Sequence, residues 1–380
     1  MHKSNLERST ELDGLRGLAA VAVVFYHSIL YPGNNASTVL LEPVQSLSSW
    51  RDVITKIALT ILNGHSAVLL FFILSGFVLT LSLDKMRGSP GGVVAKFTVR
   101  RLCRLYPALI ACLLLMWGLS LIYRNIGAVG MPFVTTETFL RNAVLVQNVL
   151  LGPTHTIQVE VLVIPFLLAM FAARAMLGTW GVIAGVAYSL LAMDRPWMVM
   201  QLPYIGDWLI AFAAGMLIAS PIVRRIASRI DGFGIAVLAV GFVFCRLFSP
   251  LVDHGAVIVQ VAVSSALVAS LYYSRADSVV RAILVTRPVQ FLGKISYSLY
   301  LLNVLALLMI WSVVGQTAVY QERPLEIGLL IGLAATLASI PASIMFERWF
   351  EQGGVRLGRY LTRQRKPAGM SSEAIGAPAE

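Results

Sequence analysis

Residues 12–27 read LDGLRGLAAVAVVFYH, an apolar stretch with two charged residues near its start and a histidine at its end. Arg16 and His27 are eleven residues apart. Eleven helical steps of about 100° make three turns plus about 20°, so both side chains project from one face, roughly 16 Å apart along the axis. Ionisable groups in an apolar span are costly unless they face a partner or a wet cavity. The stretch therefore predicts a membrane helix with a polar groove along one face.

The composition of the whole chain agrees with a membrane protein. Of its 380 residues, 57% are hydrophobic and 13% are charged, against about 45–50% and about 25% in soluble domains. The mean hydropathy is +0.77. A net charge of +11 would suggest nucleic acid in a soluble protein, but basic residues of membrane proteins collect in cytoplasmic loops. The charge thus indicates topology, and no nucleic-acid partner is expected.

Windows of about 20 residues with few charges predict ten membrane spans, which makes the fold all-α and polytopic. The first span follows Lys3, Arg8 and Arg16 and lacks a small-residue cleavage site, so we expect it to be retained. The expected spans cover residues 12–31, 64–83, 105–124, 156–176, 179–193, 204–220, 233–249, 255–273, 289–311 and 326–346.

The distribution of basic residues predicts that both termini are cytoplasmic. With this orientation, all but seven of the 30 basic residues lie on the inner side. The seven on the outer side are Arg51, Lys56, Arg124, Arg141, Arg195, Arg246 and Arg323. We expect one integral membrane domain over residues 1–366, a disordered tail over 367–380, and two outer loops, 32–63 and 125–155, long enough to carry structure.

Polar residues near Arg16 suggest how the groove could be built. Asp13 lies three residues before Arg16 and could pair with it, and Gly14 and Gly17 would let another chain or a ligand approach closely. Alternatively, Arg16 extends to the cytoplasmic headgroups and His27 sits at the outer interface. Spacing alone does not separate these interpretations.

Two arginines mark the cytoplasmic mouth of the third span. Arg101 and Arg104 are three residues apart, share a helix face and suit phosphate oxygens. Taken alone, these arginines are better explained by charge anchoring on the inner side. Glu160 lies inside the outer end of the fourth span, where it could be functional, pair with Arg141 or face water in the loop.

Further polar residues lie in other spans. Ser75 and Gly76 interrupt the second span, and Ser296, Tyr297 and Tyr300 lie on an otherwise apolar helix, where hydrogen bonds between helices would also explain them. Cys103, Cys112 and Cys245 are far apart and show no metal-ligand spacing, so neither a disulfide framework nor a metal site is expected.

Taken together, these segments resemble acyltransferase family 3, which consists of integral membrane O-acyltransferases. The resemblance covers residues 11 to about 360, and six motifs in the right order carry it. They are LDGLRGLAAVAVVFYH (12–27), LLFFILSGFVL (69–79), RRLCRLYP (100–107), HTIQVEV (155–161), SYSLYLLN (296–303) and IMFERWF (344–350).

The chain departs from the family pattern at three positions. His155 stands where the family usually has Trp, Asn303 where it has His, and Trp349 where it has Pro, while Glu347 keeps the acidic position of the last motif. His65 lies in a segment that varies between family members. These departures leave the fold expectation intact but bear on the acceptor.

The resemblance implies a reaction and a donor. Family members move an acyl group, most often acetyl, from cytoplasmic acyl-CoA to a hydroxyl of a surface glycan, a lipid-linked sugar or a small molecule. Donor binding would fall to Arg16, Ser75, Arg101, Arg104 and Tyr297. No cofactor is expected to be bound permanently, and the protein would lie in the bacterial cytoplasmic membrane, in contact with membrane lipid.

The resemblance also implies catalytic roles. His27 would be the general base on the acceptor hydroxyl, or would be acylated transiently. Arg16 would stabilise a donor phosphate or the developing oxyanion, and Glu160 would orient His27 or the acceptor.

Two other classes of function remain open from the sequence. Ten spans with intramembrane charge also suit a secondary transporter of a small metabolite or glycan, although we find no clear inverted repeat. A membrane scaffold without catalysis would use every polar residue only to hold helices together, and would tolerate replacement of Arg16, His27 and Glu160.

Overall fold

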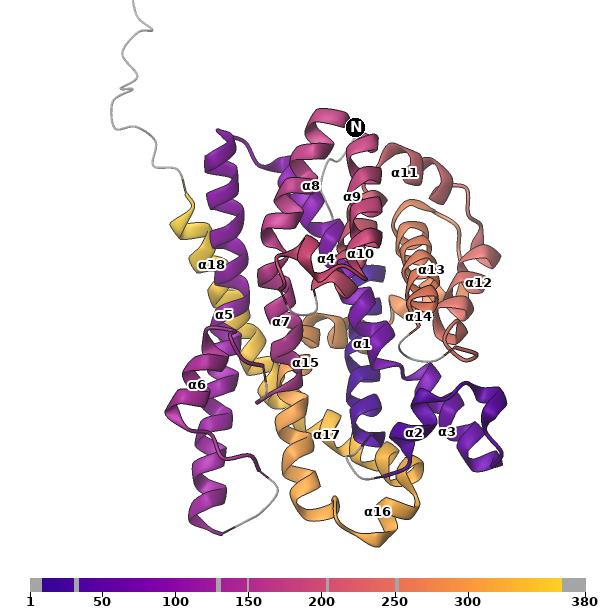
Figure 1. Ribbon diagram of the computed structural model, residues 1–380, viewed down its shortest axis with the longest axis vertical. Helices are drawn as coiled ribbons and strands as arrows, with labels where there is room; N and C mark the ends of the chain where they lie inside the picture. Colours follow the sequence, from indigo (N-terminus) through magenta and orange to yellow (C-terminus); the bar gives the residue numbers. More distant parts are fainter. Residues whose placement is uncertain are drawn as a thin grey trace, which may run out of the picture.

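A computed structural model describes residues 9–30, 34–127, 131–148, 150–202, 205–249 and 253–363 of the chain. Every regular element within these ranges is helical, and the longer helices run mainly along the long axis of the molecule (Figure 1). The helices longer than seven residues are α1 (Thr10–Ile29), α3 (Trp50–Ile61), α4 (Gly64–Lys85), α5 (Pro90–Asn125), α6 (Thr136–Ala143), α7 (Gly152–Leu162), α8 (Ile164–Leu177), α9 (Thr179–Ala192), α10 (Ile205–Ile218), α12 (Gly232–Phe244), α13 (His254–Tyr273), α15 (Arg287–Val314), α17 (Pro324–Phe346) and α18 (Gln352–Leu361). The short helices are α2 (Ala36–Leu41), η1 (Val44–Ser46), η2 (Pro196–Val199), α11 (Pro221–Ala227), α14 (Val279–Leu284), α16 (Ala318–Glu322) and η3 (Glu347–Glu351).

Seven helical segments in the described residues are long and apolar enough to cross a membrane. They are Thr10–Ile29, Trp50–Lys85, Pro90–Asn125, Gly152–Leu177, His254–Tyr273, Arg287–Val314 and Pro324–Leu361. The pair α10 and α11 would make an eighth, although it bends by 77° between its two parts. The chain is therefore an integral, multi-pass membrane protein.

The ten expected spans all overlap helices, but the structure supports a smaller number by length. The spans expected at 179–193 and 233–249 correspond to α9 and α12, which are shorter than a full crossing. Ten crossings and cytoplasmic termini thus stay predictions. The tail expected over 367–380 lies outside the described residues.

Several helices extend beyond the apolar windows used to predict them. The span expected at 105–124 is the second half of α5, which begins at Pro90 with Ser89 as its N-cap. The span expected at 156–176 begins earlier, at Gly152, and changes from α7 to α8 at Val163, just before Pro165. Hydropathy misses such polar helix ends, whereas capping residues and prolines mark them.

The two ends of the bundle can be named by the direction of α1. The proximal end holds the start of α1, the end of α4 and the start of α15; the distal end holds the end of α1 and the start of α4 (Figure 1). The loops expected to carry structure do so within the described residues, with α2, η1 and α3 in one and α6 in the other.

Helix α1 packs in the middle of the bundle against α15, α17 and α4. A Cβ atom at Gly17 would lie 2.5 Å from the backbone nitrogen of Gly293 in α15. A Cβ atom at Gly293 would lie 2.2 Å from the carbonyl oxygen of Asp13. The glycines of the first span therefore admit the backbone of α15, which fixes the groove face of α1 toward the centre of the protein.

Candidate active site

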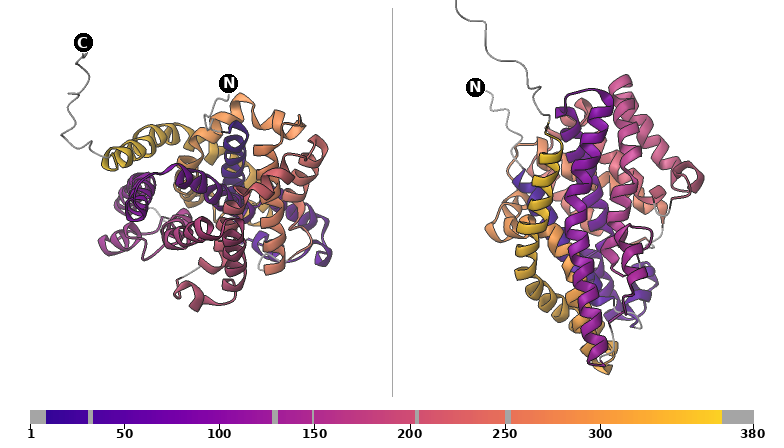
Figure 2. Two further views of the ribbon diagram at one scale, coloured as in Figure 1. Left: turned by 90° about the horizontal axis from the view of Figure 1, so that it is seen from above. Right: turned by 90° about the vertical axis from the view of Figure 1, so that its left-hand side faces the viewer.

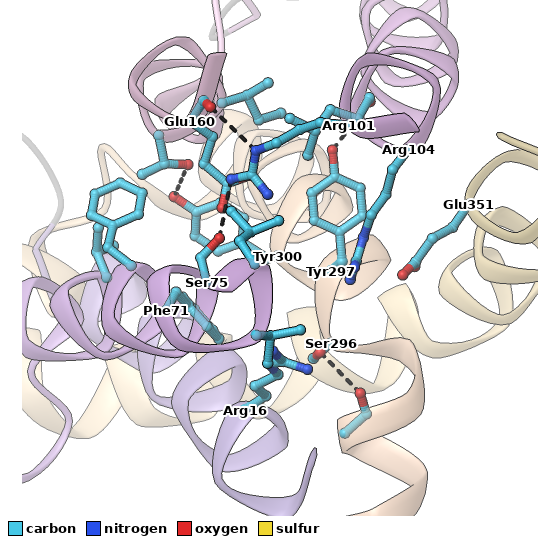
Figure 3. Close-up of a pocket in the computed structure, with 18 of the residues that line it drawn as sticks. Arg16, Phe71, Ser75, Arg101, Arg104, Glu160, Ser296, Tyr297, Tyr300 and Glu351 are labelled. Atoms are coloured by element: carbon cyan, nitrogen blue, oxygen red, sulfur yellow. Dashed lines mark hydrogen bonds and ion pairs between the residues drawn. The ribbon is translucent and has the colours of Figure 1, made fainter. Parts of the chain in front are cut away.

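A cavity of about 120 Å³ lies between α1, α4, α5, α7 and α15 (Figure 3). Its wall on α4 runs from Val68 to Leu79, which corresponds to about 16 Å along a helix axis. Polar groups from Arg16, Ser75 and Glu160 face it together with apolar side chains of α4. Its lining, mainly apolar with a few convergent polar groups, is typical of a small-molecule site.

A buried ion pair forms one wall of this cavity. Nη2 of Arg101 lies 3.4 Å from Oε2 of Glu160 and donates a hydrogen bond of 3.0 Å to Oγ of Ser75 (Figure 3). The exposed fractions of the two charged side chains are 5% for Arg101 and 19% for Glu160. Charges with so little exposure depend on each other to offset the cost of desolvation, so the pair ties α5, α7 and α4 together.

Local sequence signals place the members of this pair. Asn63 caps α4 by accepting a hydrogen bond from the Ser66 amide, and Ser75 follows two and a half turns later. Glu160 stands in the last turn of α7, before the change of helix near Pro165. These elements bring residues of three helices to one point.

The inner part of the cavity is closed by aromatic and hydroxyl side chains. The hydroxyl groups of Thr156 and Tyr300 share a hydrogen bond of 3.0 Å, and the rings of Phe71 and Tyr300 meet edge to face at 5.9 Å. Tyr297 donates a hydrogen bond of 3.2 Å to the carbonyl oxygen of Leu105. This part of the cavity is therefore lined by aromatic rings and by hydroxyl groups that bond to one another or to the backbone.

The proximal part of the cavity carries positive charge. Arg16 pairs with Asp13 at 3.4 Å, as the spacing predicted. Arg104 is exposed, and so is Lys294, whose amine lies 4.0 Å from a carboxylate oxygen of Glu347. Glu351 contributes a carboxylate to the same lining (Figure 3). Arg16, Arg104 and Lys294 thus line the proximal part of the cavity together with the carboxylate of Glu351, and the exposure of Arg104 and Lys294 marks an opening to solvent there.

The two glutamates belong to the π-helical segment η3 (Glu347–Glu351), between α17 and α18. Such segments insert a residue into a helix and often occur at functional sites. Helix α18 then packs along α5, as both views of Figure 2 show. The segment thereby presents Glu351 toward the cavity.

Six of the seven residues predicted for the site line this one cavity. They are Arg16, Ser75, Arg101, Arg104, Glu160 and Tyr297. Their roles stay predictions, but Arg101 and Arg104 differ in surroundings: Arg101 is buried against a carboxylate, and Arg104 is exposed. Arg141, the alternative partner of Glu160, instead pairs with Glu137 at 2.6 Å.

His27 does not line the cavity. It is half-buried in the last turn of α1, and its ring meets that of Tyr26 at 5.5 Å. Val23 stands between Arg16 and His27 on the shared face and is buried in the same apolar cluster as Tyr300. Glu160 was expected about one turn inside its helix; because α7 starts at Gly152, it lies about two turns inside, next to Arg101 instead of His27.

Sequence reasoning did not select several residues of the lining. Lys294 was interpreted only as a cytoplasmic charge, and Tyr300 only as a polar group between helices. No motif or spacing in the sequence singled out Thr156 or Glu351. Thr156 follows the departure at His155, and Glu351 lies four residues after the acidic position Glu347, so the motifs could have pointed to both.

A comparison of the chain with models of known families agrees with the six motifs found in its sequence. Residues 9–348 match the family model described as an acyltransferase domain. The chain belongs to acyltransferase family 3. It is therefore a membrane acyltransferase, which favours this function over the transporter and scaffold alternatives. No curated protein and no solved structure matches the chain.

Proposed function

We propose that this acyltransferase moves an acyl group, most simply acetyl, from acyl-CoA to a hydroxyl of a glycan, a lipid-linked sugar or a small molecule. The observation that carries the proposal is the distribution of charge in the cavity: Arg16, Arg104 and Lys294 line its proximal part, and its inner part is lined mainly by uncharged aromatic, aliphatic and hydroxyl side chains. Acyl-CoA has the same order, with phosphates at one end and a thioester on an uncharged arm at the other.

The phosphates of the donor would bind at the opening. Arg16, Arg104 and Lys294 line it, and the latter two are exposed to incoming ligand. One guanidinium group can donate two parallel hydrogen bonds to the oxygens of a phosphate, and a lysine ammonium adds a compact positive charge. Arg101 is engaged with Glu160 and Ser75, so we assign it to holding the cavity wall instead of contacting phosphate.

The pantetheine arm would extend along α4 toward the inner end. The wall from Val68 to Leu79 is long enough for an extended arm, and Phe71, Phe72 and Leu79 give it apolar contacts. The thioester would then lie near Thr156 and Tyr300. Transfer at this point takes place away from bulk water, which limits hydrolysis of the thioester.

His27 would act as general base from the distal side. A ring nitrogen accepts the proton of the acceptor hydroxyl while its oxygen attacks the thioester carbonyl. The C–O bond forms, the C–S bond breaks, and the CoA thiolate recovers the proton from the imidazole. Since His27 does not line the cavity, the side chains between the cavity and His27 must separate when both substrates bind.

Purified protein in detergent, incubated with labelled acetyl-CoA and candidate acceptors, tests the proposal. We expect His27→Ala to abolish transfer and to keep acetyl-CoA binding. His254→Ala is the matched control, because His254 pairs with Asp194 at 2.9 Å and does not line the cavity. Full activity of His27→Ala would exclude the base, and failure of the unmodified protein to bind acetyl-CoA would exclude the donor.

A further inference from the structure

A second cavity lies between α1, α4 and α13 at the proximal end of the bundle. Its volume is about 350 Å³, which falls within the range of about 300–1,000 Å³ that is usual for small-molecule sites. Ser82 and Lys85 line it from the last turn of α4, and Tyr272 lines it from the end of α13. We call it the proximal cavity, and we call the cavity of the candidate active site the first cavity.

The two cavities adjoin at two residues. Arg16, which Figure 3 shows in the first cavity, lines both of them, and so does Val78. The guanidinium of Arg16 pairs at 3.4 Å with Asp13, which lines only the proximal cavity. A ligand that contacts Arg16 can therefore extend into both cavities.

One face of α4 runs along both cavities. Phe71, Ser75 and Val78 line the first cavity. Val78, Ser82 and Lys85 line the proximal cavity. These positions recur every three or four residues, so they share one side of the helix, and the axial distance from Phe71 to Lys85 is about 21 Å. The cavities therefore follow one another along α4 toward its exposed end at Lys85.

The lining of the proximal cavity combines positive charge with a hydroxyl group and apolar surface. Among the described residues, it holds two cations, Arg16 and Lys85, and one carboxylate, that of Asp13. Lys85 is exposed, whereas Asp13 is buried. An exposed ammonium suits a phosphate as a compact charge, and the hydroxyl of Ser82 can donate a further hydrogen bond. The half-buried side chain of Tyr272 adds an aromatic surface.

We propose that the proximal cavity binds the nucleotide end of the acyl-CoA donor and that Lys85 recognises its 3′-phosphate. The pyrophosphate binds at the junction through Arg16, supported by Arg104 and Lys294 from the first cavity, and the pantetheine arm continues into the first cavity. The adenosine packs against Tyr272, and its 3′-phosphate accepts a hydrogen bond from the Lys85 ammonium. This inference rests on the proposed function, in which acyl-CoA is the donor.

The junction at Arg16 favours a nucleotide over the phosphate of a membrane lipid. A lipid headgroup could also bind Lys85, but its acyl chains would extend into the bilayer and would not use the continuation into the first cavity. The nucleotide of CoA carries its uncharged arm on the pyrophosphate, so one molecule fills both cavities and places its pyrophosphate at the residue that they share.

Kinetics with two donors test this subsite. Acetyl-3′-dephospho-CoA differs from acetyl-CoA only by the phosphate that Lys85 would bind. We expect the KM of the unmodified protein to be about tenfold lower for acetyl-CoA, the size of one charge-assisted contact. Lys85→Ala should raise the KM for acetyl-CoA about tenfold and leave the KM for acetyl-3′-dephospho-CoA unchanged. Lys85→Arg should keep most of the preference.

Arg87→Ala is the matched control. Arg87 is exposed two residues after Lys85, donates a hydrogen bond of 3.1 Å to the carbonyl oxygen of Asp84 and lines neither cavity. Its replacement removes one positive charge next to the cavity and should change neither KM. An equal rise of the KM for acetyl-CoA in Arg87→Ala and Lys85→Ala would mean that Lys85 acts only through the general charge of this end, which would overturn its assignment.

Binding without chemistry separates this inference from the proposed function. Adenosine 3′,5′-bisphosphate carries the nucleotide end of the donor without a thioester. Calorimetry with the purified protein should show that it binds and that Lys85→Ala weakens its binding about tenfold, whereas AMP, which lacks the 3′-phosphate, should bind both proteins equally. Such binding without acyl transfer from acetyl-CoA would support the subsite and reject the proposed function.

Three results would overturn the subsite while leaving acyl transfer intact. The first is an equal KM of the unmodified protein for acetyl-CoA and acetyl-3′-dephospho-CoA. The second is an equal rise of both KM values in Lys85→Ala. The third is loss of co-purified anionic phospholipid in Lys85→Ala with an unchanged ratio of the two KM values, which would assign the proximal cavity to a lipid headgroup instead.

Discussion

At the scale of single residues, the ion pair of Arg101 and Glu160 is the strongest feature of the site. Arg101 is buried and Glu160 is mostly buried, so removal of one partner leaves the other charge without a counter-ion. We expect Glu160→Gln to lower the free energy of unfolding by about 3 kcal/mol, the size typical of a broken buried pair. Thermal unfolding of the purified protein in detergent measures this change.

The surface pair of Arg141 and Glu137 is the control for this prediction. Its side chains are 51% and 71% exposed, so Glu137→Gln should change stability by less than about 1 kcal/mol. The double variant Arg101→Met with Glu160→Gln should recover stability but not transfer activity. Equal losses of stability in Glu160→Gln and Glu137→Gln would mean that burial does not make the Arg101–Glu160 pair more important for stability than the surface pair.

The same residues show how much of the site the sequence could predict. Positions 101 and 104 share a helix face, so spacing predicted one common role for both arginines. Only the structure brings Glu160 of α7 and Ser75 of α4 to Arg101 and leaves Arg104 exposed. The spacing of residues within one helix shows which side chains share a face of that helix. It does not show which residues of other helices they contact, because those contacts depend on how the helices pack.

At the scale of helices, the contact of α1 with α15 fixes the face on which Arg16 stands. Gly17 and Gly293 allow this close approach. Gly17→Ala would place a methyl group 2.5 Å from a backbone nitrogen, and overpacking of this kind costs about 1–3 kcal/mol. We expect a lower thermal midpoint and a loss of activity, because the wall of the cavity shifts with α1.

Gly118 in α5 gives a matched comparison. A Cβ atom there would have no neighbour within 4 Å, so Gly118→Ala should be neutral or should stabilise the helix by up to about 1 kcal/mol. Unfolding curves of both variants in one detergent make the comparison. A stable, active Gly17→Ala variant would show that α1 and α15 are not held by this contact.

The helices also show why span positions were predictable and their bounds were not. Apolar windows located α1, α4, α5, α13, α15 and α17. They missed the first half of α5, where Lys96, Arg100 and Arg101 lower the hydropathy although the helix continues. A cap such as Ser89 with Pro90 marks such a start better than hydropathy does.

At the scale of the whole molecule, the distribution of basic residues predicts which end of the bundle faces the cytoplasm, and this orientation can be tested. We expect the proximal end to face the cytoplasm, because the connection from α4 to α5 lies there with Lys85 and Arg87, and basic residues collect on the inner side. In a variant without its three native cysteines, a new cysteine at Ser89 should react with an impermeant maleimide only in inside-out vesicles. One at Ser48, in the loop before α3, should react only in right-side-out vesicles; the opposite pattern would reverse the topology.

The charge at the cavity opening leads to a prediction about the donor that does not depend on the acceptor. If Arg104 and Lys294 bind the phosphates of CoA, Arg104→Ala should raise the KM for acetyl-CoA about tenfold, as expected for one charge-assisted contact. The KM for acetyl-pantetheine, which carries the thioester without phosphates, should not change. Lys294→Ala should behave in the same way, and both effects should decrease at high salt because exposed charges are screened.

Arg225 provides the control for total charge, because it is exposed in α11 and does not line the cavity. Arg225→Ala removes one positive charge from the same end of the protein and should leave both KM values unchanged. An equal rise for acetyl-CoA and acetyl-pantetheine in Arg104→Ala would mean that Arg104 shapes the cavity instead of binding phosphate. Because the two donors differ only in the part that the opening would bind, their ratio separates an electrostatic contact from a general loss of structure.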